Sequence, residues 1–139
     1  MPIAFSYGTP DGEEFGSAQT RGRVTALLFV TTFDLPSQIA ARRLDEVIRR
    51  HRPRANAGAI ALEAPDHAPL VDVFRTTLAL SYPVALTMTP GVQHEGPFGI
   101  IDRVPTLVVL DARGREVTRG HGNMTAEEIE EALRSAEKR

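Results

Sequence analysis

The sequence contains no cysteine. This absence excludes disulfide bonds, thiol nucleophiles and cysteine metal sites, and it also removes the usual indicator of the redox compartment. Lysine is nearly absent too, since Lys138 is the only lysine among 16 basic residues. The 18 acidic residues bring the formal net charge to −2. There is therefore no basic excess that would indicate binding to nucleic acid.

No apolar run approaches the roughly 20 residues that a membrane-spanning helix needs. The N-terminus also lacks the basic-then-apolar pattern of a signal peptide. The chain of 139 residues is long enough for one domain with one core, and no repeat or linker divides it. We therefore expect a chain without a membrane span, folded as a single domain over residues 1–139.

The most informative stretch is the junction between an apolar run and a helix start. Leu27–Val30 has the continuous hydrophobic pattern of a strand buried on both faces. Asp34 suits a helix N-cap, and Pro36 suits the first turn because its missing N–H would be unbonded there. Function often sits at such a strand-to-helix junction in open α/β sheets.

Periodicity and turn signals predict the other elements. They alternate between strand and helix in the first half of the chain, which implies parallel strands joined by helical crossovers, and a late hairpin adds antiparallel strands. The fold class is therefore α/β, with a central mixed sheet flanked by helices. The expected elements are a hairpin within 2–20, strands at 24–30, 57–62, 83–88, 104–111 and 116–119, helices at 35–51 and 66–80, a short helix before Pro105, and a last helix opened by the capping box Thr125–Glu128.

Helical spacing also predicts which side chains are buried. On the first helix it places Asp45 with the charged residues of the solvent face. The expected buried stripes are Ile39, Ala40, Leu44, Val47 and Ile48 on the first helix, Leu70, Val73, Phe74, Thr77 and Leu78 on the second, and Ile129, Ala132, Leu133 and Ala136 on the last.

Four segments resemble the thioredoxin superfamily, in particular the TlpA-like branch of bacterial thiol–disulfide oxidoreductases. TPDGEEFGSAQTRGRV is similar to the N-terminal hairpin of that branch, and LLFVTTFDLPSQ lies where the family has its strand and Trp-Cys-x-x-Cys segment. Residues 57–99 resemble the helix-and-strand insertion, and IDRVPTLVVLDARGREVTRGHG resembles the cis-proline strand and closing hairpin. The resemblance implies a thioredoxin-like fold and a cis Val104–Pro105 bond.

The chain departs from the family at the active site. With Phe33 at the position of the family's tryptophan, Asp34 and Ser37 take the two cysteine positions. Thiol–disulfide exchange needs a thiolate, and neither a carboxylate nor a hydroxyl can form or break an S–S bond. Redox activity of the family's kind is therefore excluded by composition, and no catalytic residue, metal ligand or cofactor is predicted.

The resemblance leaves a peptide-binding groove as the predicted functional element. In the family, the backbone of the residue before the cis-proline pairs with an extended peptide, and this pairing needs no cysteine. Phe33 and Phe98 are expected to lie in the groove or in the core. The positions that match the family site are Thr32, Phe33, Asp34, Ser37, Val104, Pro105 and Gly122.

Two alternatives stay open at this stage. One is a non-redox enzyme, a hydrolase or lyase, that uses Asp34 with a loop histidine. The other is a metal-binding protein that uses His94 and His121 with a carboxylate such as Glu95. The expected partner is a protein or peptide, with no nucleic acid. The compartment is extracytoplasmic by resemblance if a leader has been removed, and cytoplasmic otherwise.

Overall fold

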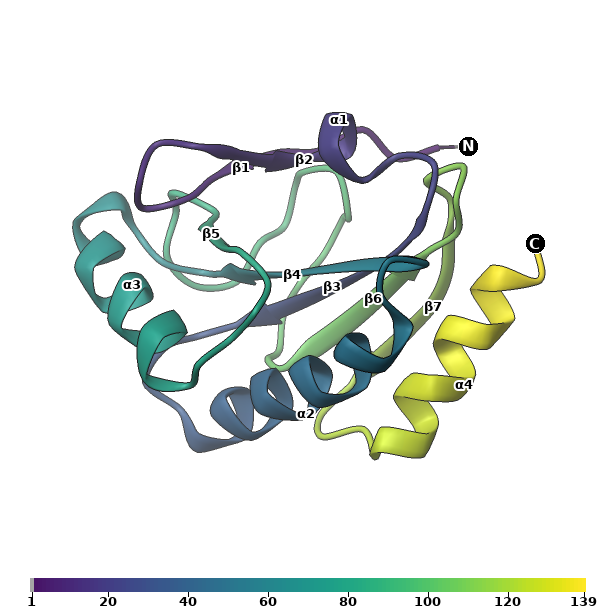
Figure 1. Cartoon of the computed structure of the whole chain (residues 1–139). Helices are drawn as coiled ribbons and strands as arrows, with labels where there is room; N and C mark the ends of the chain where they lie inside the picture. Colours follow the sequence, from purple (N-terminus) through teal and green to yellow (C-terminus); the bar gives the residue numbers. More distant parts are fainter. Residues whose placement is uncertain (1) are drawn as a thin grey trace.

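The computed structural model describes residues 2–139 (Figure 1). A mixed sheet forms its centre, and a short 3₁₀ turn at Pro65–His67 leads into the third helix. The elements are β1 (Ser6–Gly8), β2 (Glu14–Gly16), α1 (Ser17–Thr20), β3 (Val24–Val30), α2 (Leu35–His51), β4 (Ala55–Ala61), α3 (Ala68–Thr77), β5 (Val84–Leu86), β6 (Thr106–Leu110), β7 (Glu116–His121) and α4 (Ala126–Glu137).

The seven strands lie in the order β2-β1-β5-β4-β3-β6-β7. β3 is central and every one of its residues is buried; it runs parallel to β4 and antiparallel to β6. β4 and β5 are also parallel, so the carboxyl ends of β3, β4 and β5 meet along one edge. We call this the carboxyl edge of the sheet and the opposite edge the amino edge.

Two apolar layers hold the sheet. On one face, α2 lies below the strands, with α3 to its left and α4 to its right (Figure 1), and Leu44, Ile48 and Leu133 are fully buried. On the other face, the N-terminal hairpin and the 88–101 loop cover the strands, and Phe5 packs against Phe15 and Phe98 at ring-centroid distances of 5.9 and 5.4 Å. Within residues 2–139, no helix is both long and apolar enough to cross a membrane.

Most of the predicted elements are confirmed. β3 and α2 have the predicted bounds, and the capping box that opens α4 is formed by Thr125 and Glu128. The predicted short helix before Pro105 is wrong. In its place, Gln93 and Ile101 exchange both backbone hydrogen bonds, at 2.9 and 2.8 Å, and hold the loop as an isolated bridge. The short helix α1 was not predicted.

The prediction for Asp45 is also wrong, because only 1% of this residue is exposed. Its Oδ1 accepts hydrogen bonds from the N–H and the hydroxyl of Ser81, at 2.9 and 2.5 Å, and its Oδ2 accepts one from Arg49 at 2.8 Å. Burial raises the pKa of the Asp45 carboxyl, but the hydrogen bonds from Ser81 and Arg49 outweigh burial and hold that pKa below its ordinary value. The carboxylate therefore ties α2 to the segment that leads into β5.

The predicted burial of the helix stripes holds only in part. All four predicted residues of α4 are buried. On α3, however, only Phe74 of the predicted stripe is buried, while Leu70 and Val73 are 52% and 59% exposed. On α2, Ile39 is 39% exposed although the rest of its stripe is buried. Periodicity identifies an apolar face but does not tell whether another element covers it. Within residues 2–139, no element covers Leu70 and Val73.

We predict that Asp45→Asn lowers the free energy of unfolding at neutral pH by about 2 kcal/mol, because the ionised acceptor of Ser81 and Arg49 is lost. A depressed folded-state pKa stabilises the fold above the unfolded-state value of about 3.8, and this contribution disappears as the pH falls through the lower folded-state value. Urea unfolding at neutral and acidic pH should therefore show a difference between wild type and variant that shrinks in acid. An equal difference at both pH values would contradict this account.

Candidate functional site

Asp34 caps α2 at the carboxyl edge. Its Oδ1 accepts a hydrogen bond from the Ser37 N–H at 2.7 Å, which is the N-cap arrangement expected from the sequence. Its Oδ2 accepts from the Ser37 hydroxyl at 3.0 Å and from the Thr31 hydroxyl. Both carboxylate oxygens are therefore occupied by groups of the same turn.

Ser37 is fully buried and its hydroxyl is used twice. Besides donating to Asp34, the oxygen accepts a hydrogen bond from the Thr31 N–H at 3.2 Å. No histidine of residues 2–139 lies within hydrogen-bond distance of this hydroxyl or of the Asp34 carboxylate. The geometry therefore brings together neither a Ser–His pair nor the Asp34–His pair that the enzyme alternative requires.

A buried carboxylate from the next strand holds the other half of the turn. Glu63 follows β4 and is 2% exposed. It accepts hydrogen bonds from the N–H and the hydroxyl of Thr32, at 2.7 and 2.8 Å, and its Oε1 lies 2.8 Å from Nδ1 of His67. Glu63 therefore fixes Thr32 at the end of β3 and orients the ring of His67, whose side chain is 42% exposed.

The Glu63–His67 pair was missed in the sequence, although a signal for it exists. Glu63 comes directly after a small, apolar strand that the pattern predicts to be parallel to β3. Side chains that follow neighbouring parallel strands meet at one sheet edge, so a carboxylate there lies beside Thr32. His67 is four residues further along the chain.

The cis-proline segment lies on the other side of the β3 end. Phe29 of β3 pairs with Thr106 at the start of β6, which puts the cis Val104–Pro105 bond next to the turn after β3. The Pro105 carbonyl accepts a hydrogen bond from the Gly122 N–H at 2.9 Å. Gly122 has φ +76°, a conformation that favours glycine. The predicted cis bond is present.

All seven predicted site positions therefore lie along the carboxyl edge, although their exposure differs. Phe33 is 77% exposed, whereas Phe98, the other candidate aromatic, is in the core. Ser37 and Pro105 are buried, and Val104 is half-buried. Within residues 2–139, neither the N–H nor the carbonyl of Val104 forms a backbone hydrogen bond.

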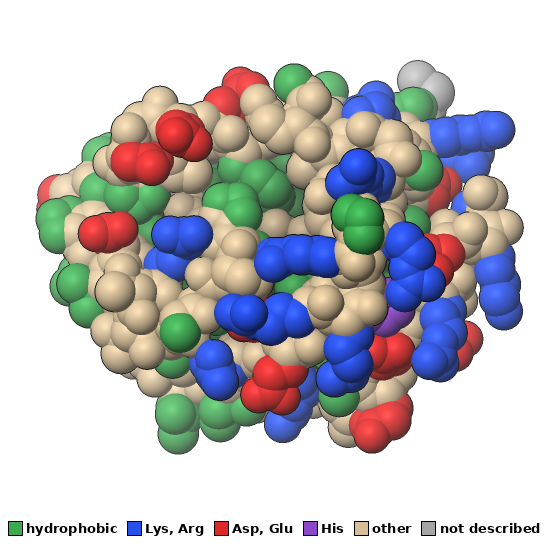
Figure 2. Space-filling model, viewed as in Figure 1, with side chains coloured by type: hydrophobic (Ala, Val, Ile, Leu, Met, Phe, Trp, Pro, Cys, Tyr) green, Lys and Arg blue, Asp and Glu red, His purple; other side chains and the backbone are tan. Residues whose placement is uncertain are grey.

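The structure also reveals an apolar surface that was not predicted. Phe33 and Leu35 at the start of α2 are largely exposed. Exposed residues of α3 lie across a groove from Phe33, whereas Leu35 lines a neighbouring depression. Gln38 and Leu78 border this groove and also the neighbouring depression that contains Ile39. Hydrophobic side chains project from the lower left of Figure 2, at the α2–α3 corner of Figure 1. We define the junction patch as Phe33, Leu35, Ile39, Leu70 and Val73.

The remaining histidines do not form a metal site. His51 is buried between Glu130 and Glu137 at the end of α2, and Nδ1 of His121 lies 3.0 Å from the Thr106 hydroxyl. Within residues 2–139, no group of three or more His, Asp or Glu side chains could hold a metal ion. The metal-binding alternative required His94 and His121 to converge with a carboxylate, and the structure does not bring such a set together.

Comparison with protein-family models and with curated proteins finds no match for the sequence. Solved structures are similar over nearly the whole chain. A thiol:disulfide interchange protein of the thioredoxin family from Chlorobium tepidum is 22% identical, with a TM-score of 0.78 and coverage of 97% of this chain and 94% of that one. A DsbF homologue from Corynebacterium diphtheriae is 17% identical, with a TM-score of 0.81 and coverage of 96% and 85%.

These similarities define a thioredoxin-like α/β fold whose structural relatives are thiol–disulfide oxidoreductases of the DsbE and TlpA type, at low sequence identity. The chain itself has no cysteine and is therefore not a thiol redox enzyme.

We predict that Asp34→Ala lowers the free energy of unfolding by about 1 kcal/mol, because the Ser37 N–H loses its cap. Asp34→Asn is the matched control, since asparagine caps helices about as well as aspartate. Chemical denaturation of both variants gives the comparison. Equal destabilisation by alanine and asparagine would show that the charge, and not the cap, stabilises the junction.

We also predict that the double variant D34C/S37C forms an intramolecular disulfide readily. The Asp34 Oδ2 and the Ser37 Oγ are 3.0 Å apart, so side chains at these two positions already approach each other. Thiol titration and intact mass after mild oxidation provide the readout, and D34C alone is the control. Two thiols that stay unpaired would contradict the assignment of these positions to the family's cysteine pair.

Proposed function

We propose that the protein is a non-redox protein-binding module that holds an extended, apolar peptide segment at the carboxyl edge of its sheet. The observation that carries this proposal is the junction patch, where large apolar side chains lie in solvent beside the helix start that bears the dithiol in the family. A contiguous exposed apolar patch of a few hundred Å² often marks an interaction site, whereas single scattered apolar residues do not.

The apolar residues of the patch do not serve the core. Phe33 is 77% and Leu35 is 64% exposed, and Leu70 and Val73 of α3 line the same groove as Phe33. Fully burying a side chain of this size contributes about 1.5–3 kcal/mol, so leaving several exposed forgoes considerable stability. A partner that covers them regains that free energy on binding.

The backbone of Val104 supports an extended conformation for the bound segment. The N–H and the carbonyl of Val104 have no backbone partner within residues 2–139. Val104 lies two residues before Thr106, the first residue of β6 that pairs with β3. Backbone groups of this kind accept an added strand, which provides affinity through hydrogen bonds, while a neighbouring apolar groove selects side chains. The hydrogen bonds between Asp34 and Ser37 hold the turn that carries Phe33, so the apolar groove keeps its position beside Val104.

The proposal predicts that selection from a displayed library of unstructured peptides enriches sequences with a large apolar side chain. Phe33→Ser should weaken their binding by about 2 kcal/mol, roughly thirtyfold, because one large apolar contact is lost. Ile100→Ser is the matched control, since Ile100 is 59% exposed but lies outside the junction patch. Fluorescence anisotropy with a labelled peptide measures both.

A second arm tests the strand pairing. N-methylation of the central backbone amides of a selected peptide removes the donors that an added strand requires, and we expect binding to be lost. Equal loss in Phe33→Ser and Ile100→Ser, or no enriched peptide at all, would contradict the proposed function. If the N-methylated peptide binds as tightly as the unmodified one, strand addition is excluded, and the apolar contact is the only part of the proposal that remains.

A further inference from the structure

The basic side chains of this protein fall into two groups. Seven of the 16 form ion pairs with carboxylates, and nine lie farther than 4.0 Å from any carboxylate within residues 2–139. Two of these nine donate hydrogen bonds to backbone carbonyls on the helix face, Arg43 to Met124 and Arg75 to Tyr82. The other seven are Arg21, Arg23, Arg52, Arg54, Arg113, Lys138 and Arg139. Of these, Arg21 donates a hydrogen bond to the Ile3 carbonyl at 2.9 Å.

The sheet topology brings these seven to the amino edge. Arg21 and Arg23 precede β3, and Val24 pairs with Ala55, so the Arg52–Arg54 loop lies beside them. The Arg113 turn joins them because the Ala112 carbonyl accepts a hydrogen bond from the Gly22 N–H at 2.9 Å. α4 also ends at this edge, where Glu137 contacts His51 at the end of α2.

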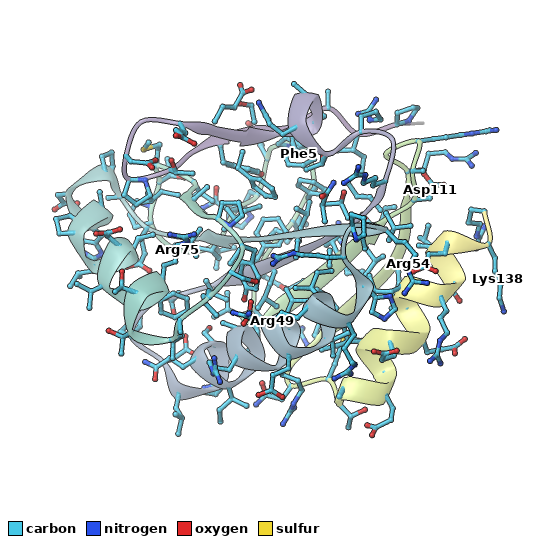
Figure 3. The ribbon with its side chains drawn as sticks, in the orientation of Figure 1. Phe5, Arg49, Arg54, Arg75, Asp111 and Lys138 are labelled. Atoms are coloured by element: carbon cyan, nitrogen blue, oxygen red, sulfur yellow. The ribbon has the colours of Figure 1, made fainter. Side chains whose placement is uncertain are left out.

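All seven residues are exposed. Figure 3 shows Arg54 and Lys138 on the same side of the molecule as Asp111, and Figure 2 shows basic side chains concentrated on that side. We call this set of seven residues the basic cap. It lies at the opposite end of the strands from the junction patch.

Most carboxylates near the basic cap already pair with arginines that lie outside it. Asp111 pairs with Arg115 at 3.0 Å and is almost fully buried, and Glu116 pairs with Arg119 at 2.8 Å. Glu130 pairs with Arg50 and Arg134 and also contacts His51. Among the described residues, Glu137 pairs only with His51 and with no arginine, so it remains as one negative charge beside Lys138. The seven cations of the cap therefore leave this end of the molecule with an excess of positive charge.

We infer that the basic cap binds the surface of an anionic phospholipid bilayer. The cap draws its residues from three loops and the end of α4, so it forms a broad surface and not a row along a groove. A row beside exposed aromatic side chains would suit single-stranded nucleic acid. Among the phenylalanines of residues 2–139, Phe33 alone is largely exposed, and it lies at the opposite end of the strands.

The net charge of −2 does not prevent this interaction. At physiological ionic strength, charges are screened over about 8 Å, so a flat anionic surface interacts mainly with the cap that touches it. Arginine suits such a surface because its guanidinium binds phosphate groups with two parallel hydrogen bonds. Binding in this orientation also leaves the junction patch facing away from the lipid.

Co-sedimentation with vesicles tests the inference. We expect the protein to bind vesicles of phosphatidylcholine that contain phosphatidylglycerol, to ignore vesicles of phosphatidylcholine alone, and to dissociate in high salt. The double variant R52Q/R54Q should bind roughly tenfold or more weakly, because two cations of the cap are removed. R42Q/R103Q is the matched control, since it removes two cations of the same type that lie outside the cap.

Unchanged binding by the control together with the loss in R52Q/R54Q would support the inference. Equal loss in both variants would show that only overall charge matters and would overturn it. No binding to phosphatidylglycerol vesicles at low salt would overturn it as well. In a parallel titration, retention of the protein by duplex DNA in preference to the vesicles would assign the cap to nucleic acid instead. Melting curves of both variants control for folding.

Discussion

Two carboxylates hold the turn between β3 and α2, and the arrangement of the whole carboxyl edge depends on them. Asp34 satisfies the Ser37 N–H at the start of α2, and buried Glu63 satisfies the Thr32 N–H from the neighbouring strand. Backbone N–H groups at and just before a helix start must find an acceptor when water is excluded, and in this turn two carboxyl side chains provide it. In this way the chain keeps a thioredoxin-like junction without sulfur.

The fixed turn determines what surrounds it. Because Thr32 is held by Glu63 and Asp34 is held by its own turn, Phe33 between them is directed into solvent. The pairing of β3 with β6 places this turn beside the start of β6, where Val104 leaves its backbone groups without backbone partners in the described residues. The geometry of this edge thus follows from the two hydrogen-bonded carboxylates together with the pairing of β3 and β6.

Much of this arrangement could be predicted from local signals. The buried run of β3, the Asp34 cap and the capping box of α4 each depend on residues close together in sequence, and each prediction was confirmed. Asp45 was predicted wrongly because its partner Ser81 is 36 residues away and only the folded chain brings them together. For the same reason Leu70 and Val73 were assigned to the core, since periodicity cannot show that an apolar face stays uncovered.

The basic cap could not be predicted from the net charge. A total of −2 gives no sign that seven cations meet at the amino edge with no carboxylate partner among residues 2–139, because they come from distant segments that only the sheet order brings together. The molecule therefore carries two surfaces of different chemistry at opposite ends of its strands. Binding at the junction patch should depend on the apolar side chains of the partner, whereas binding at the basic cap should depend on salt and on the negative charge of the partner. The two surfaces can therefore be tested independently.

The most direct test of the central claim is a nuclear magnetic resonance titration of the isotopically labelled protein with a peptide that it selects. The account predicts that the largest amide shift changes occur at Thr32, Phe33 and Val104, while the amides of the Arg52–Arg54 loop do not move. Shift changes confined to other parts of the surface, with the carboxyl edge unchanged, would contradict it.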